Sequence, residues 1–269
     1  MKLIDIGANL SNSQFNNDID NTLKNASLHN VKQIILTTVN TDSFIKNLTI
    51  CQSQQPVELY TTWGLHPHYS QHLDTFLLET LEKFQQNSKY IKAIGEFGLD
   101  FFRMISNKTS QEKSMHYFLN FSKNNNYPLF LHEREAHDIF CSIFKDHTIE
   151  QKSVIHCFTG NKIELKNYLD LNMYIGITGW ICDDRRNQNL IEALNYIPID
   201  KLMIETDSPY LKPRTIKSKS IRNEPAFLQI ILEKISTIKN ISIEELGETI
   251  YNNSIDFFNI KHLDKKPKL

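Results

Sequence analysis

Eight short apolar runs recur along the chain, and each is bounded by turn-forming residues. They are rich in Val, Ile, Leu and Thr and lack strict alternation, which is typical of strands buried on both faces of a parallel sheet. The predicted strands are 3–6, 33–39, 59–65, 91–96, 128–132, 153–156, 173–177 and 201–205.

Segments between these runs carry apolar positions three and four residues apart, which predicts amphipathic helices. Seven of them lie between consecutive strands, at 17–29, 42–54, 73–86, 111–124, 136–145, 162–171 and 187–195. Two more follow the eighth strand, at 225–238 and 243–258. Capping-box patterns at Thr109–Glu112 and Ser242–Glu245 predict the starts of two helices.

Eightfold alternation of strand and helix, without a linker, predicts a (β/α)₈ TIM barrel in one α/β domain. We expect the domain to span 1–260 and the tail 261–269 to be frayed. An open doubly wound sheet is the alternative, but it would need a glycine-rich phosphate loop after the first strand. The segment Asp5–Leu10 does not match that pattern.

Composition and charge describe an ordinary globular protein. The net charge of −1 provides no overall attraction to nucleic acid or to a membrane, so a polyanion would need a local basic patch. The four cysteines show no paired spacing, which fits a reducing compartment. The chain opens directly into a strand-like run and has no apolar stretch near the roughly 18 residues of a membrane span, so we expect a cytoplasmic protein.

Polar residues able to bind metal follow four of the predicted strands. They are Glu96, His132, His156 and Asp207. In a closed barrel the carboxyl ends of the strands form one rim, so these four side chains are expected to meet in one cavity. Two imidazoles and two carboxylates suit Mg²⁺, Mn²⁺ or Zn²⁺, and the carboxylates favour the harder ions.

Other candidates belong to the same rim. His66 and His68 follow the third strand. One of them could orient substrate or protonate a leaving group, and the other could be solvated. Trp63 and Trp180 are expected to be core residues, although either ring could stack on a base. Basic residues cluster after the later strands, and those assigned to substrate phosphates are Arg134, Arg214, Lys217 and Lys219, the last three in the basic loop 212–222.

Several motifs resemble those of the TatD family of metal-dependent deoxyribonucleases. They include Gly64–His68, Ile94–Asp100, His156–Gly160, Ile204–Tyr210 and Arg222–Pro225, in order over residues 3–260. The resemblance implies an amidohydrolase-like barrel, a divalent-metal site and hydrolysis of phosphodiester bonds in DNA. It implies a 3′-to-5′ exonuclease on single-stranded DNA, with RNA as a further substrate, and a role in DNA repair or clearance.

The resemblance also carries residue roles. Glu96, His132 and His156 match the family's metal ligands, and Asp207 matches an acidic residue that acts as ligand or base. The sequence departs from the pattern in two places, at three positions. Asp5 and Gly7 stand where most relatives have a His-x-His pair, and Glu135 replaces an aspartate.

The resulting hypothesis is metal-assisted hydrolysis, with Mg²⁺ as the first choice and Mn²⁺ or Zn²⁺ as alternatives. Asp207 would take a proton from water, and His66 would assist the leaving oxygen. The same barrel could instead hydrolyse a small-molecule ester, amide or lactone, or an aminoacyl-tRNA. A binding protein on an inactive barrel is a third reading. No obligate protein partner is implied, which is compatible with a monomer.

Overall fold

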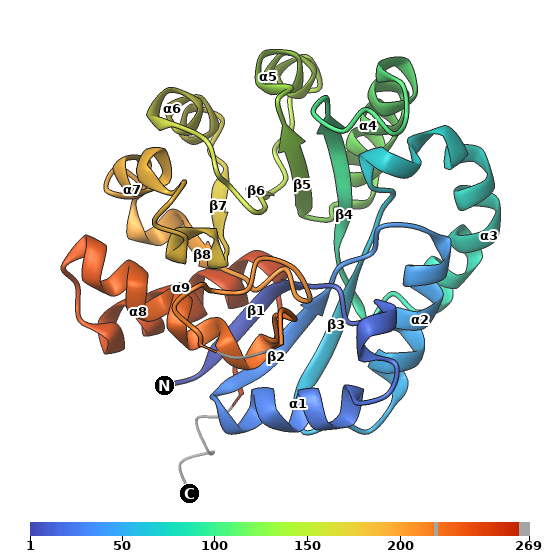
Figure 1. Ribbon diagram of the computed structural model, residues 1–269. Coiled ribbons are helices and arrows are strands. Elements are labelled where there is room, and N and C mark those ends of the chain that lie inside the picture. Colours follow the sequence, from blue (N-terminus) through green and yellow to red (C-terminus); the bar gives the residue numbers. More distant parts are fainter. Residues whose placement is uncertain (218–219, 264–269) are drawn as a thin grey trace, which may run out of the picture.

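The computed structural model describes residues 1–217 and 220–263, and its strands form one parallel eight-stranded sheet in sequential order (Figure 1). All eight predicted strands are confirmed, and together they form a nearly closed TIM barrel. Their bounds are β1 Leu3–Ala8, β2 Val31–Leu36, β3 Glu58–Trp63, β4 Ile91–Asp100, β5 Leu129–Arg134, β6 Ser153–Ile155, β7 Tyr174–Ile177 and β8 Leu202–Ile204.

The junction between β8 and β1 is closed just beyond the strand ends. The backbone N–H of Asp207 donates to the carbonyl of Gly7 at 2.8 Å, and that of Asn9 donates to the carbonyl of Ser208 at 2.7 Å. We call this junction the barrel seam. These two hydrogen bonds continue the pairing between β1 and the chain after β8 toward the mouth of the barrel.

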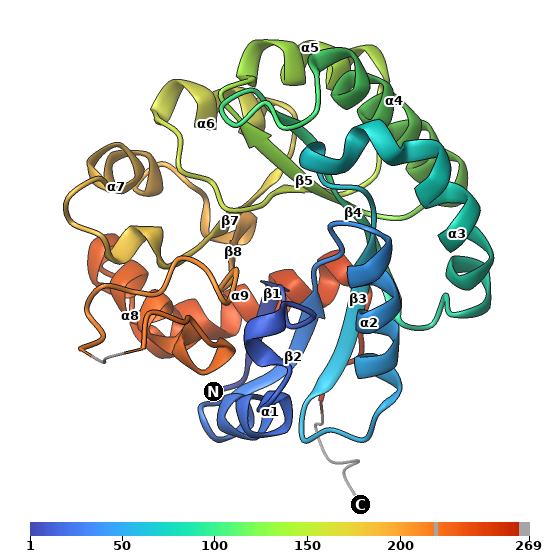
Figure 2. The same ribbon diagram turned by 45° about the vertical axis from the view of Figure 1, so that its right-hand side comes forward.

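The helices lie outside the strands, and α3 to α8 follow one another around the ring (Figure 2). All nine predicted helices are confirmed, with bounds α1 Ile19–Leu28, α2 Thr41–Gln52, α3 Leu73–Gln86, α4 Lys108–Asn125, α5 His137–Asp146, α6 Lys162–Asp170, α7 Gln188–Leu194, α8 Leu228–Lys239 and α9 Ile243–Phe258.

One predicted helix start is wrong and one is confirmed. Helix α4 begins at Lys108 because the side chain of Asn107 accepts from the backbone N–H of Ser110 at 2.9 Å, so the capping box at Thr109 does not form. At α9, Ser242 is the N-cap and accepts from the N–H of Glu245 at 3.2 Å.

Two apolar cores hold the barrel together. The larger one lies between the strands and the surrounding helices. The smaller one fills the barrel with Ile4, Ile6, Ile35, Ala93, Phe130, Val154 and Met203, and it is joined by residues of α9 such as Ile255 and Phe257. The interior is therefore packed beneath the mouth, which leaves the carboxyl ends of the strands to build a site.

Within the described part of the chain, the model contains no helix with the length and apolar character that crossing a bilayer requires. The barrel is a single domain. Its exact limits at 1–260 stay a prediction, and residues 264–269 of the predicted tail lie outside the described residues.

Candidate metal and active site

Strand periodicity directs polar side chains into the mouth of the barrel. On β5, β6 and β8 an interior apolar residue is followed two positions later by a polar one, and alternate residues of a strand share a face. The pairs are Phe130 with His132, Val154 with His156, and Met203 with Glu205. The apolar member fills the barrel, and the polar member lies directly above it.

Three imidazoles converge on one carboxylate oxygen, Oε1 of Glu96. Nδ1 of His132 lies 2.8 Å from it, Nε2 of His156 lies 2.9 Å from it and Nε2 of His66 lies 3.4 Å from it. We call these four residues the histidine cluster. They come from the carboxyl-terminal parts of β3 to β6, so the structure brings together three of the four predicted ligands.

The chemistry of His156 and Glu96 fits a divalent cation. Nδ1 of His156 donates to Oε2 of Glu205 at 3.1 Å, which leaves the lone pair of Nε2 directed at another lone-pair donor, Oε1 of Glu96. A carboxylate that holds the far nitrogen of a histidine is the usual support of a metal-binding imidazole. Only a proton or a cation between the two acceptors makes their close approach favourable.

His132 provides a second sign of a cation site. Its Nε2 is buried and has no hydrogen-bond partner among the described residues, although Oδ2 of Asp100 lies 3.7 Å away. His66, Glu96 and His132 each offer a ligand atom within 4.8 Å of the others. Buried polar atoms without partners are rare in folded proteins unless a ligand or ion completes them.

His66 fits a hydrogen-bond donor better than a ligand. Its Nδ1 accepts from the backbone N–H of His68 at 3.1 Å, so the proton of the neutral ring is on Nε2. Burial lowers the pKa of His66 to about 3, which keeps the ring neutral. The Nε2–H group therefore faces the cluster as a donor, as its predicted role in assisting a leaving oxygen requires.

The charges of the cluster depend on one another. Burial alone would lower the pKa of His156, but the carboxylates of Glu96 and Glu205 raise it well above its usual value. Burial alone would raise the pKa of Glu96, but His156, His66 and the hydrogen bond from His132 hold it well below its usual range. Glu96 is thus ionised, and its buried negative charge is stabilised by positive charge and hydrogen-bond donors around it.

Asp207 lines the same cavity but lies outside the 4.8 Å group of ligand atoms. Its Oδ1 accepts from Nδ2 of Asn9 at 2.8 Å, and burial raises its pKa to about 7. A carboxyl group with this pKa exchanges a proton near neutral pH.

Asp5 and Gly7, which replace the His-x-His pair of the TatD pattern, lie at the barrel seam. The carboxyl group of Asp5 accepts from the N–H of Thr206 at 2.9 Å and from its hydroxyl at 2.5 Å, and burial raises the pKa of Asp5 to about 8. A Cβ on Gly7 would overlap Oε2 of Glu205. Asp5 therefore ties β8 to β1, and Gly7 leaves room for the carboxylate that supports His156.

The mouth opens into a cavity of about 1050 Å³ that includes all four residues of the histidine cluster and Asp207. Arg134 also lines it, with its guanidinium 3.9 Å from the ring centroid of Phe102. Glu135 lines the cavity too, at a backbone φ of 52°.

The other predicted phosphate-binding residues are more dispersed. Arg214 lines a smaller hollow beside the cavity, and Lys217 lines neither space. Lys219 lies outside the described residues. Arg222, in the same basic loop, forms ion pairs with Asp18 and Glu224 at 2.7 and 2.8 Å, so these two carboxylates already neutralise its charge.

The two tryptophans differ in place. Trp63 is fully buried among Phe76, Phe84, Phe118 and Phe121, and its Nε1 donates to Thr80, so it is a core residue. Trp180 is half-buried and lines the cavity.

Sequence reasoning missed Glu205 and also Asp100, whose Oδ2 lies 2.8 Å from Nε2 of His68. Glu205 could have been found, since it stands two residues after the interior Met203, in the same register as His132 and His156.

Comparison with known proteins agrees with this geometry. The family described as TatD related DNase matches residues 4–259. The 3′-5′ ssDNA/RNA exonuclease TatD of Erwinia tasmaniensis is 37% identical over 261 residues, covering 96% of this chain and 100% of the relative. The protein of that name from Salmonella typhimurium is 39% identical over 245 residues, covering 87% of this chain and 90% of the relative.

Solved structures agree on the barrel. A TatD family hydrolase from Entamoeba histolytica superposes with a TM-score of 0.89 at 28% identity, covering 96% of this chain and 98% of the other. A TatD homologue from Escherichia coli has a TM-score of 0.86 at 24% identity with the same coverage, which supports the fold alone. By its sequence along nearly its whole length, this chain belongs to the TatD-related DNase family.

Proposed function

We propose that the protein is a divalent-metal-dependent nuclease that removes nucleotides from the 3′ end of single-stranded DNA and also acts on RNA. The observation that carries this proposal is the convergence of three imidazoles on Glu96 within a cavity of about 1050 Å³. Membership of a DNase family, with relatives named as 3′-5′ exonucleases, supports the choice of substrate and polarity.

The residues that would hold the ion are Glu96, His132 and His156, with Asp207 as a further carboxylate at the edge of the site. A divalent cation held there supplies Lewis-acid polarisation of a phosphoryl oxygen. We propose Mg²⁺ as the natural ion because carboxylates suit hard cations, with Mn²⁺ and Zn²⁺ as alternatives that the imidazoles would accept.

Side chains of the protein would take up the proton of the attacking water and stabilise the leaving oxygen. Asp207, with a pKa of about 7, would take the proton of the attacking water on Oδ2, since Asn9 holds Oδ1. His66, which is neutral, would donate a hydrogen bond from Nε2–H to the leaving oxygen and keep its proton. Glu205 would keep His156 in the orientation that directs Nε2 at the ion.

Substrate phosphate would be held by Arg134, which lines the cavity. A cytoplasmic location is part of the same proposal, and it is supported by the four cysteines, all of which are free. Action without an obligate protein partner, and a role in DNA repair, rest on the family resemblance.

Digestion of end-labelled single-stranded oligonucleotides tests the proposal. Samples labelled at the 3′ or the 5′ end would be incubated with Mg²⁺ or Mn²⁺, and with EDTA. We expect immediate release of the 3′ label, a descending ladder of 5′-labelled products, and neither of these with EDTA or with His156→Ala.

A folded protein that binds metal and cleaves neither oligonucleotide would contradict the proposal. A small-molecule ester or an aminoacyl-tRNA would then be the substrate to test. A ladder from the 3′-labelled strand, with immediate release of the 5′ label, would contradict the polarity alone.

A further inference from the structure

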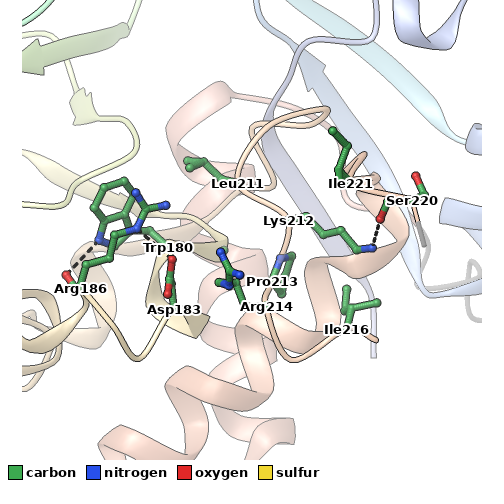
Figure 3. A pocket seen from close by; sticks show the side chains of 11 residues that line it. Trp180, Asp183, Arg186, Leu211, Lys212, Pro213, Arg214, Ile216, Ser220 and Ile221 are labelled. Atoms are coloured by element: carbon green, nitrogen blue, oxygen red, sulfur yellow. Dashed lines mark hydrogen bonds and ion pairs between the residues drawn. The ribbon is translucent and has the colours of Figure 1, made fainter. Parts of the chain in front are cut away.

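A smaller hollow of about 360 Å³ adjoins the cavity, between the loops that follow β7 and β8 (Figure 3). Its lining includes Trp180, Arg186, Pro213, Arg214 and Ile221. Trp180 and Leu211 line both spaces, so the hollow continues the cavity outward.

The indole of Trp180 is held in a fixed position at this boundary. The guanidinium of Arg186 lies over the ring at 3.6 Å from its centroid, and the indole N–H donates to the carbonyl of Arg186 at 3.4 Å (Figure 3). Nε of Arg186 is held in turn by the carboxylate of buried Asp183 at 2.9 Å. An ordered aromatic ring beside a cation loses little freedom when a flat ligand stacks against it.

Charge in the hollow is positive. Arg186, Lys212 and Arg214 line it, and Asp183 is the one acidic residue among its described lining. That carboxylate is already shared between Arg186 and Arg185, which contacts it at 2.7 Å. Arg214 is exposed and forms no ion pair with any residue that the structure describes.

We infer that this hollow is a subsite for the second nucleotide on the 5′ side of the one being removed, which a dinucleotide lacks. Its base would stack on Trp180, and its phosphate would be bound by Arg214. The inference rests on the proposed function, because an enzyme that shortens a strand from its 3′ end must let the 5′ part of the strand leave the cavity. An aromatic face next to cations is the surface that a single strand uses without sequence preference.

Substrate length tests the subsite. Hydrolysis of a dinucleotide, which ends within the cavity, would be compared with hydrolysis of a dodecamer by wild type, Trp180→Ala, Trp180→Phe and Arg214→Ala. We expect the ratio of kcat/KM for the dodecamer to that for the dinucleotide to fall about tenfold in Trp180→Ala, in the range that loss of one stacked base produces. The ratio should also fall in Arg214→Ala, because the charge-assisted contact to the phosphate is lost. Trp180→Phe keeps an aromatic face and should retain most of the ratio.

Lys145→Ala is the matched control for loss of one positive charge. Lys145 is exposed in the last turn of α5, at the end of the barrel away from the mouth, and it should leave the ratio unchanged. A fall in this control equal to that of Arg214→Ala would mean that general charge is responsible and would overturn the subsite.

Fluorescence provides a readout that does not depend on turnover. The chain has two tryptophans, and Trp63 is fully buried, so the dodecamer added in EDTA should quench emission from Trp180 and leave Trp180→Phe unaffected. An unchanged length ratio and no quenching, in an enzyme that still digests oligonucleotides, would overturn the subsite and leave the proposed function intact. Failure of wild type to cleave either substrate would overturn the proposed function, and the subsite with it.

Discussion

Two groups of buried polar side chains lie at the same mouth of the barrel, and they differ in how their hydrogen bonds are satisfied. In the histidine cluster, three imidazoles surround one oxygen of Glu96, and Nε2 of His132 has no hydrogen-bond partner among the described residues. At the barrel seam, the carboxyl group of Asp5 is satisfied by Thr206. Burial is common to both.

At this mouth, hydrogen-bond satisfaction separates the candidate site from the structural contact. An unpaired buried polar atom is costly, and at His132 a bound cation would complete it. A buried carboxyl group with a full set of donors needs nothing further. We therefore assign chemistry to the histidine cluster and barrel closure to Asp5.

Glu96→Gln gives the largest expected effect. The amide keeps the shape of the side chain but removes the charge on which three imidazoles converge, so the rate of oligonucleotide hydrolysis should fall about 10³-fold, as loss of a central electrostatic group does in other enzymes. Steady-state kinetics measures this, with circular dichroism to verify folding. A fall of less than tenfold would place the centre of the site elsewhere.

Gly7→Ala should have an intermediate effect, because its Cβ would displace the carboxylate of Glu205 from His156. Loss of such a supporting carboxylate typically costs 10–100-fold in metal affinity or activity. Gly176→Ala, whose Cβ would lie 2.6 Å from the other oxygen of Glu205, should act in the same way.

Gly247→Ala is the control for these two variants. Its Cβ would meet only the flexible side chain of Met1 and a methyl group of Leu232, far from the mouth in α9, and it should retain wild-type activity. Equal rates for all three glycine variants would contradict the role given to Glu205.

Asp5→Ala should act on stability more than on chemistry. It leaves the N–H and hydroxyl of Thr206 buried without their acceptor, which costs about 1–3 kcal/mol in the free energy of unfolding. Urea denaturation measures this change. Asp5→Asn keeps one acceptor oxygen and should therefore lose less unfolding free energy than Asp5→Ala. Equal stability of wild type and Asp5→Ala would show that the seam is closed by backbone hydrogen bonds alone.

The smallest effect concerns pH. The pKa of Asp5 is raised from 3.8 to about 8 by burial, so the folded protein keeps a proton that the unfolded chain has lost. The stabilisation is complete below pH 3.8 and is lost as pH rises toward 8.

Denaturation in EDTA from pH 5 to pH 8 would test this. The wild type should lose stability with rising pH by at most roughly 1.4 kcal/mol per pH unit from this group. Asp5→Asn should show a flatter dependence. Parallel curves would mean that Asp5 is ionised in the folded protein.

Much of the fold could be predicted because the apolar runs and the helical spacing point to the same architecture. The main error in strand length is at β4, which continues to Asp100 instead of ending at Glu96. Gly95 and Gly98 resemble a strand end, but each is needed where β5 approaches closely. A Cβ on Gly98, at a φ of 146°, would overlap the carbonyl oxygen of His132.

The site was less predictable, because strand ends identify which residues reach the mouth but not what each one contacts. His66, His132 and His156 all reach the mouth, yet only the hydrogen bond from the N–H of His68 shows that His66 is a donor. The carboxylates illustrate the same limit. Glu205 supports His156, whereas Asp207 is held by Asn9, and their shared motif does not distinguish them.

Titration calorimetry of Mn²⁺ binding to wild type, Glu96→Gln and Asp5→Asn distinguishes the histidine cluster from the barrel seam as the metal site. We expect Glu96→Gln to bind Mn²⁺ about 100-fold more weakly than the wild type or worse, whereas Asp5→Asn should bind the ion as the wild type does. Undiminished binding in Glu96→Gln, or loss of binding in Asp5→Asn, would contradict the assignment of the metal site to the histidine cluster.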